Sequence, residues 1–204
     1  MISMNLAVFD LEGTLVKEEF LVELGRAVGE EKEIEKITKL GLEGKINWEN
    51  GLKNRIEILR GLEHETIAHA ARKFTYREGA FEAIRFLREN NFEIAIITGG
   101  FGISACEISK NLGINFLACN ELKFENGKLA GVTVNVNGNK DEWLRFFADK
   151  LEAKITLAFG DGANDFAMLE AATYGKLLCN GENLHKEVER ILNIFKPAIK
   201  IGMR

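Results

Sequence analysis

The sequence predicts an α/β protein with a doubly wound parallel sheet, a Rossmann-like core, and two insertions. From Glu78 onward, short apolar runs alternate with amphipathic segments, which is the pattern of strands and helices in such a sheet. Residues 16 to about 75 instead carry helical periodicity almost throughout, which indicates a small helical bundle inserted after the first strand. Asn126-Gly127 separates two strand-like runs and predicts a short β-hairpin with a type I′ turn.

The first strand is expected at Leu6 to Phe9, because four consecutive apolar residues there end at Asp10. Glycines then divide the helical block, since glycine favours helix ends. The predicted helices of this block cover residues 16–28, 34–42, 48–59 and 66–74.

The remaining elements follow from the same change of period along the chain. The hairpin arms are expected at 122–125 and 128–136. Predicted helices cover 78–90, 101–112, 139–151, 164–172 and 183–192, and predicted strands cover 92–98, 115–119, 155–160 and 175–179. We expect residues 1–15 and 76–204 to form the α/β core and residues 16–75 to form a separate helical domain.

Composition limits the classes of partner. The 204 residues, 46% of them hydrophobic, suffice for one sizeable core and a small accessory unit. The 27 basic and 31 acidic side chains are interleaved and give a net charge of -4, which argues against a nucleic-acid partner. No window reaches the ~18 apolar residues of a membrane span and the first ten residues do not resemble a signal peptide. We therefore expect no membrane partner and a cytoplasmic location.

The cysteines and histidines do not suggest a metal site. Cys106, Cys119 and Cys179 lie far apart and form no C-x-x-C pair, so neither a disulfide framework nor a thiolate zinc site is expected. His64 and His69 are five residues apart and do not share a helical face.

Two aspartate-bearing segments carry the chemistry. Asp10 follows the first apolar strand, and Asp161 follows the strand at 155–160 within Gly-Asp-Gly-Ala-Asn-Asp. If the two strands are neighbours, both carboxylates lie at the carboxyl edge of the sheet, where ligands of such folds bind. Two carboxylates held together repel unless a cation lies between them, and oxygen ligands suit Mg²⁺. The sequence therefore predicts a magnesium-dependent enzyme.

The segment Thr98-Gly99-Gly100 follows a predicted strand and precedes a helix, and it supports two interpretations. Its backbone N–H groups and the Thr98 hydroxyl could hold a phosphate, as in a phosphatase. Gly100-x-Gly102-x-x-Ala105, with Glu121 further on, also matches a dinucleotide fingerprint. That alternative places the fingerprint on the second strand and leaves the aspartate segments unexplained.

These motifs resemble those of the haloacid dehalogenase-like hydrolases in order and context. The motifs are Asp10-x-Glu12-Gly13-Thr14, Thr98-Gly99-Gly100, Lys140 and Gly160-Asp161-Gly162-Ala163-Asn164-Asp165. The whole chain, including the helical insertion, resembles the phosphoserine phosphatase family. Glu19, Trp48 and Arg55 match positions where that family recognises phosphoserine, with Trp48 in place of the more usual Phe.

The resemblance implies a role for each residue. Asp10 would be the nucleophile that forms an aspartyl-phosphate, and Glu12 would be the acid and base. Thr98, Gly99, Gly100 and Lys140 would neutralise the phosphoryl oxygens. Mg²⁺ would bind Asp10, the Glu12 carbonyl and Asp161, with Asn164 and Asp165 orienting that shell and Asn164 also lying near the substrate.

Glu12 departs from the family, whose more usual residue at this position is Asp. Glu retains the carboxylic acid but is one methylene longer. Some relatives with a DLEG motif also transfer the phosphoryl group to homoserine, so the acceptor is the open point. Hydrolysis of O-phosphoserine by a monomer or homodimer is the first expectation. The alternatives are a related small-molecule phosphatase or phosphotransferase, a non-catalytic binding module and the dinucleotide-binding protein.

Overall fold

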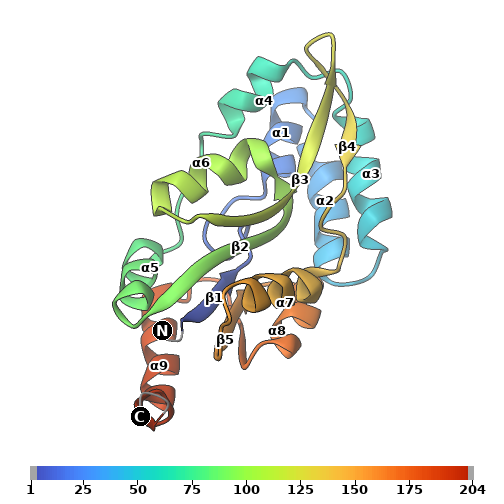
Figure 1. Ribbon diagram of the computed structural model, residues 1–204. Helices are drawn as coiled ribbons and strands as arrows, with labels where there is room; N and C mark the ends of the chain where they lie inside the picture. Colours follow the sequence, from blue (N-terminus) through green and yellow to red (C-terminus); the bar gives the residue numbers. More distant parts are fainter. Residues whose placement is uncertain (1–3, 202–204) are drawn as a thin grey trace.

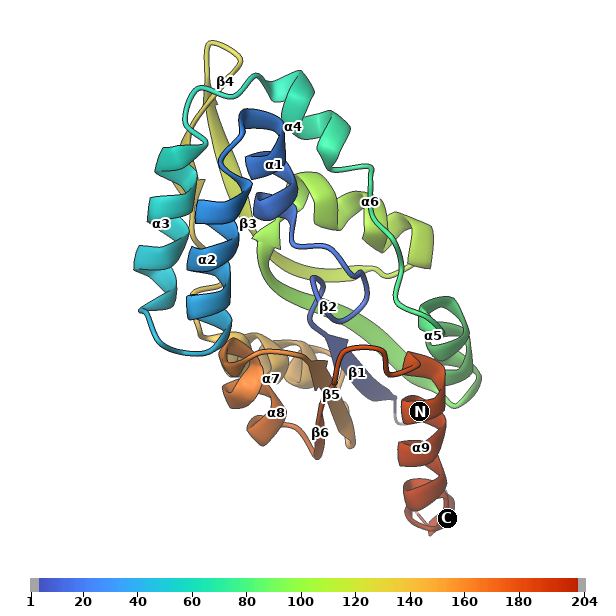
Figure 2. The same ribbon diagram turned by 180° about the vertical axis from the view of Figure 1, so that it is seen from behind.

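The computed structural model describes residues 4–201 and contains one six-stranded sheet in the order β4-β3-β2-β1-β5-β6 (Figures 1 and 2). Every neighbouring pair is parallel except β3 and β4. The strands are β1 (Asn5–Phe9), β2 (Phe92–Phe101), β3 (Phe116–Glu125), β4 (Lys128–Thr133), β5 (Thr156–Gly160) and β6 (Tyr174–Leu177). The predicted α/β fold with a mostly parallel sheet is confirmed.

Helices cover both faces of the sheet because the core strands are apolar on both sides. Ala7 and Phe9 of β1 face one hydrophobic cluster with α5, α6 and α9, whereas Leu6 and Val8 face a second cluster with α7 and α8. These helices are α5 (Ala80–Glu89), α6 (Gly102–Leu112), α7 (Lys140–Lys150), α8 (Phe166–Ala171) and α9 (Leu184–Ile201).

The four remaining helices form a group beyond the carboxyl ends of β1 and β2 (Figures 1 and 2). They are α1 (Phe20–Val28), α2 (Glu31–Leu42), α3 (Trp48–Ile58) and α4 (His64–Ala70). Their apolar side chains, such as Phe20, Leu24 and Ile34, make a third cluster that includes Phe101 of β2 and Leu129 of β4. This group therefore rests on the hairpin as well as on the sheet.

Several boundaries differ from the sequence-based ones. The predicted strand at 115–119 and the hairpin arm at 122–125 are one continuous strand, β3, which passes from the sheet into the hairpin. Helix α1 begins at Phe20 rather than at residue 16, because Val16 pairs with Tyr76 as extended chain. The hairpin turn has positive φ at both Asn126 (50°) and Gly127 (77°), as a type I′ turn requires.

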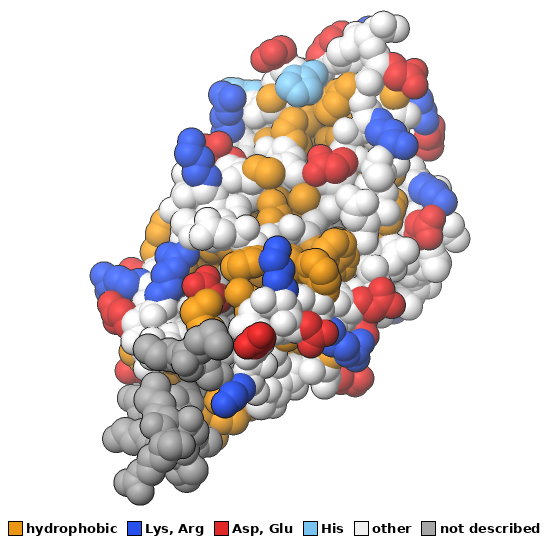
Figure 3. Space-filling view, in the orientation of Figure 1, with side chains coloured by type: hydrophobic (Ala, Val, Ile, Leu, Met, Phe, Trp, Pro, Cys, Tyr) orange, Lys and Arg blue, Asp and Glu red, His pale blue; other side chains and the backbone are white. Residues whose placement is uncertain are grey.

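Acidic and basic side chains are interspersed on the face shown in Figure 3, and neither sign forms a large field there. Among residues 4–201, no helix combines the length and apolarity needed to cross a membrane.

A bulge interrupts the pairing of β2 with β3 at the edge of the sheet that carries the aspartates. Ile97 pairs with Ala118, but Phe101 pairs with Asn120, so β2 has extra residues between these pairs. The Asn120 side chain, which is fully buried, donates to Gly99 O (2.8 Å) and Val136 O (3.2 Å). Its Oδ1 accepts from the N–H groups of Asn135 and Val136. One side chain thus joins the bulge to the segment that follows the hairpin.

We predict that Asn120→Ala lowers the free energy of unfolding by about 2–4 kcal/mol, because it leaves several buried backbone groups without partners. Urea denaturation measures this change. Asn111→Ala is the matched control, since the exposed Asn111 side chain makes a single hydrogen bond to Tyr76, and we expect a change below ~0.5 kcal/mol. Equal losses in the two variants would contradict the role of Asn120.

Candidate active site

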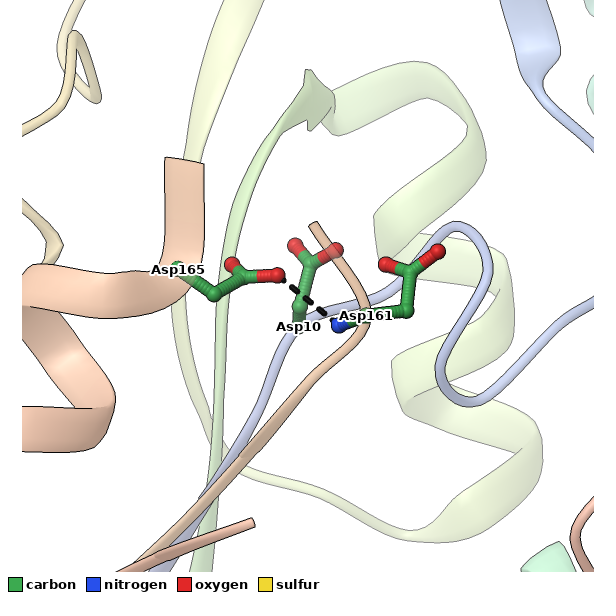
Figure 4. Close-up of side chains that lie close together, drawn as sticks. All are labelled: Asp10, Asp161 and Asp165. Atoms are coloured by element: carbon green, nitrogen blue, oxygen red, sulfur yellow. Dashed lines mark hydrogen bonds between the residues drawn. The ribbon is translucent and has the colours of Figure 1, made fainter. Parts of the chain in front are cut away.

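Three carboxylates meet at the carboxyl edge of the sheet. Asp10 follows β1, Asp161 follows β5, and Asp165 ends the short 3-10 turn Ala163–Asp165. Because β1 and β5 are paired neighbours, Asp10 and Asp161 converge as predicted. One oxygen of each of the three side chains lies within 4.8 Å of the others, and Figure 4 shows them grouped.

Lys140 is the cation in this cluster. It is the first residue of α7, only 2% exposed, and its Nζ donates to Asp10 Oδ1 (2.7 Å) and Asp165 Oδ1 (2.6 Å). Asp165 Oδ2 accepts from the backbone N–H groups of Asp161 and Gly162, so this carboxylate is held on both sides. Burial alone would lower the pKa of Lys140, but Asp10 and Asp165 raise it above its ordinary value.

One cation does not balance three carboxylates. Burial raises the pKa of Asp10 well above its usual range, opposed by Lys140 and reinforced by the other two aspartates. Burial, with the neighbouring Asp165 and Glu19 charges, raises the pKa of Asp161 to about 7, although the positive charges of Lys140 and Arg77 oppose this shift. Both shifts show that the ionised cluster needs further positive charge.

The residues fit a divalent metal ion. The cluster offers only oxygen ligands, and two buried oxygens next to it, Asp161 Oδ1 and Asn164 Oδ1, have no hydrogen-bond partner. Buried polar atoms are normally paired, so atoms like these indicate a missing ligand. A hard cation with oxygen ligation satisfies them and supplies the missing charge.

Beside the carboxylates lies a cavity of about 50 Å³. It is lined by residues from the sheet edge and from the inserted helices: Asp10, Glu12, Glu19, Trp48, Arg55, Thr98, Gly99, Gly100 and Asn164. The structure therefore brings together in one cavity every residue that the sequence suggested for substrate binding.

The inserted helices contribute a charged pair to this cavity. Glu19 directly precedes α1, and Arg55 lies on α3. The Arg55 guanidinium donates to Thr38 Oγ1 (2.9 Å) and Gly51 O (3.2 Å). Burial lowers the pKa of Arg55, whereas Glu19 and Glu12 oppose that shift. The pKa of Glu12 is raised well above its usual range by burial first and then by Glu19, which favours the protonated acid.

The segment Thr98-Gly99-Gly100 forms the bulge of β2, which continues to Phe101, the residue directly before the first residue of α6. Its glycines allow close approach: a Cβ at Gly99 would lie 2.8 Å from Trp48 Cζ2, and one at Gly100 would lie 2.7 Å from Glu12 Oε1. The Gly100 N–H donates to Thr98 Oγ1 (2.9 Å). Thr98, Gly99 and Gly100 line the same cavity as Glu12.

The geometry does not favour the dinucleotide alternative. A Cβ at Gly102 would lie 2.5 Å from Glu121 Oε1, so the Glu121 carboxylate occupies the space that a pyrophosphate would need beside that glycine.

Sequence reasoning missed three residues that support the site: Thr38, Arg77 and Asn120. Thr38 is a buried hydroxyl on the apolar side of α2, four residues after the buried Ile34, and that pattern was a usable signal. Asn120 and Arg77 bind backbone carbonyls of distant segments, and a sequence carries no local mark of such contacts.

Comparisons with known proteins agree with this geometry. The family model for haloacid dehalogenase-like hydrolases matches residues 7–170. The phosphoserine phosphatase of Methanocaldococcus jannaschii is 37% identical over 176 residues, which cover 82% of each chain. A solved structure of a phosphoserine phosphatase phospho-aspartyl intermediate analogue has a TM-score of 0.86 and 33% identity, covering 94% of this chain and 99% of its own. A substrate-bound phosphoserine phosphatase structure has the same TM-score at 32% identity, with coverages of 95% and 99%.

Family match, relatives and fold agree over most of the length, and the motifs meet in one site. The chain belongs to the haloacid dehalogenase-like hydrolases and, within them, to the phosphoserine phosphatase family.

Proposed function

We propose that this protein hydrolyses O-phosphoserine to serine and inorganic phosphate, with Mg²⁺ as its metal ion. The observation that carries the proposal is the single cavity in which Asp10, Glu12 and the Glu19–Arg55 pair face one another. The related phosphoserine phosphatases support it, since they share the fold over nearly the whole chain.

Asp10 is the proposed nucleophile. Its carboxylate oxygen bonds to phosphorus as the ester P–O bond breaks, which divides one difficult displacement into two steps. Lys140 holds the Asp10 carboxylate in orientation through the 2.7 Å contact. When bound by Asp10, the Glu12 carbonyl and Asp161, Mg²⁺ supplies positive charge to the phosphoryl oxygens, and Asn164 and Asp165 orient these ligands.

Glu12 is the proposed acid and base. Because its pKa is raised, the carboxylic acid form is available to donate a proton to the departing serine alkoxide. The resulting carboxylate then accepts a proton from the water that attacks the aspartyl-phosphate, which releases phosphate and restores Asp10. Thr98 and the Gly99-Gly100 backbone, at the cavity wall, contact the phosphoryl oxygens in this scheme.

Residues 16–75 are the proposed cap over this site, and residues 1–15 and 76–204 the core. Trp48 and Arg55 of α3 line this cavity together with Glu12 and Gly99 of the core. We expect the cap to move Trp48 and Arg55 away from the core when substrate enters, and their return to exclude water from the reaction.

The first prediction concerns the nucleophile. Asp10→Asn should lower kcat at least about a thousandfold, because an amide cannot form the acyl-phosphate. Phosphate release from phosphoserine measures this loss. Asp141→Asn, which changes a partly exposed aspartate paired with Arg145 on α7, should keep full activity. Turnover in Asp10→Asn close to the wild-type value would disprove the covalent route.

The second prediction concerns metal binding and pH. Since Asp161 must lose its proton to bind Mg²⁺ and its pKa is about 7, we expect the affinity to rise up to about tenfold per pH unit below pH 7. Excess chelator should abolish hydrolysis. Calorimetric titrations at pH 5.5, 6.5 and 8 test this, and an affinity independent of pH would contradict it.

The same shift sets the sign of a stability effect. In the folded metal-free protein the Asp161 carboxyl binds its proton more tightly than in the unfolded chain, where the pKa of this carboxyl is near 3.8. The contribution of Asp161 should therefore lower metal-free stability as pH rises from about 4 to about 7. Urea denaturation should show a larger loss in the wild type than in Asp161→Asn, because Asp10 and Glu12, whose pKa values are also raised, contribute a loss to both proteins.

The third prediction concerns substrate choice. Arg55 can bind the substrate carboxylate through parallel hydrogen bonds, and Glu19 can bind its ammonium group. Arg55→Ala should lower kcat/KM for phosphoserine about 30-fold or more, roughly 2 kcal/mol, and change p-nitrophenyl phosphate hydrolysis far less. Arg60→Ala is the control, because this exposed arginine follows α3 and pairs with Glu57. Equal losses on both substrates would refute phosphoserine as the substrate and leave the phosphatase intact.

One observation keeps phosphoryl transfer as the second candidate. The longer Glu12 side chain reaches Gly100 and narrows the cavity in which water or another acceptor must attack. If homoserine is the acceptor, adding it during phosphoserine turnover will yield phosphohomoserine at the expense of free phosphate. Absence of that product leaves hydrolysis as the reaction.

A further inference from the structure

Arg77 lies where the chain returns from the inserted helices to the core. Its N–H donates to Leu15 O (2.9 Å), and the Lys17 N–H donates to Thr75 O (2.9 Å). With the pairing of Val16 and Tyr76, these bonds join the outgoing and returning segments side by side. The Arg77 side chain therefore starts from a fixed backbone position, beside a cavity that it lines together with Asp161.

The Arg77 guanidinium binds backbone carbonyls of two separate loops. Nη2 donates to Gly13 O in the loop after β1, and Nη1 donates to Cys179 O (3.0 Å) and Glu182 O (3.1 Å) in the loop after β6. A guanidinium is suited to this task because its donors are arranged in a rigid plane. Both loops border a cavity of about 470 Å³ that reaches Asp161.

Gly13 connects this contact to the aspartate cluster. Its φ of +74° favours glycine, and a Cβ at this position would overlap the Asp161 carboxylate. The Gly13 backbone thus forms the wall against which the Asp161 side chain lies. Asp161 Oδ1 is buried and has no hydrogen-bond partner, so the close contact with Gly13 restrains a side chain that this oxygen does not anchor.

We propose that Arg77 is a positioning residue for the divalent metal site: by holding Gly13 and the 179–182 loop together, it keeps the Asp161 carboxylate directed at Asp10. This inference rests on the metal site of the proposed function. The ligands of metal ions commonly depend on such outer contacts, whose loss weakens metal binding about 10–100-fold.

An electrostatic role alone makes the opposite prediction. Removing a positive charge beside a carboxylate cluster strengthens cation binding, and replacing Arg with Lys, which retains the charge, changes little. If Arg77 instead positions Asp161, it needs the planar guanidinium that binds both loops, so Arg77→Lys and Arg77→Gln should both weaken Mg²⁺ binding.

The test measures the Mg²⁺ dissociation constant by calorimetry for the full chain and these two variants at pH 9. At that pH Asp161 is ionised, so loss of the Arg77 charge, which lowers the Asp161 pKa, does not weaken binding by protonating this carboxylate. Arg88→Lys is the matched control, because Arg88 also donates to backbone carbonyls, those of Leu112 (3.0 Å) and Gly113 (2.6 Å), away from the aspartates. We expect the dissociation constant to rise about tenfold in both Arg77 variants and to stay within twofold in Arg88→Lys. An unchanged constant in Arg77→Lys, a tighter one in Arg77→Gln, or an equal rise in Arg88→Lys would overturn the proposal.

Amide hydrogen exchange of the metal-free protein separates this inference from the metal site itself. Residues 12–14 and 160–163 should exchange faster in Arg77→Lys than in the wild type or Arg88→Lys. If the wild type does not bind Mg²⁺, the metal assignment fails, and the exchange rates alone decide the role of Arg77. Exchange that is unchanged in these segments would then refute it.

Discussion

The contact of Lys140 with Asp10 and Asp165 is the interaction on which the site depends. Asp10, Asp161 and Asp165 lie close together although they come from different segments of the chain. Without a buried cation, repulsion among these carboxylates would push the segments apart. Lys140 reaches that point because it opens α7, directly after the segment that Asn120 binds to the β2 bulge. The hydrogen bonds of Asn120 at the bulge therefore help to hold Lys140 where it balances the charge of the aspartates.

The position of the site could be predicted from the sequence, but the buried hydrogen bonds that hold the site in place could not. Asp10 and Asp161 could be placed together because apolar strands mark their own ends and neighbouring parallel strands end at one edge. The turn at Asn126-Gly127 was equally visible, since its residues favour positive φ. The continuity of β3 through Asn120 was not visible, because a buried Asn resembles a turn residue until its four hydrogen-bond partners are known.

Boundaries failed where tertiary pairing overrode local pattern. Residues 16–19 share the helical periodicity of α1, yet Val16 is extended against Tyr76 because the outgoing and returning chains pair there. Similarly, Thr98-Gly99-Gly100 remains in β2, because Phe101 pairs with Asn120 beyond the bulge. In both segments the observed backbone differs from the one that the local pattern predicts, and both segments contribute residues to the cavity wall.

The balance of charge also bears on the order in which the cation and the substrate bind at this site. Asp10, Glu12 and Glu19 line the same small cavity, Asp161 lies close to Asp10, and Lys140 already binds two aspartates. A phosphate monoester brings further negative charge into this volume, and in a poorly hydrated site that repulsion is strong. Arg55 can offset only the substrate carboxylate. If the protein acts as proposed, we expect the divalent cation to bind before or together with the phosphoryl group, and we expect Arg77 to hold Asp161 in place before the cation binds.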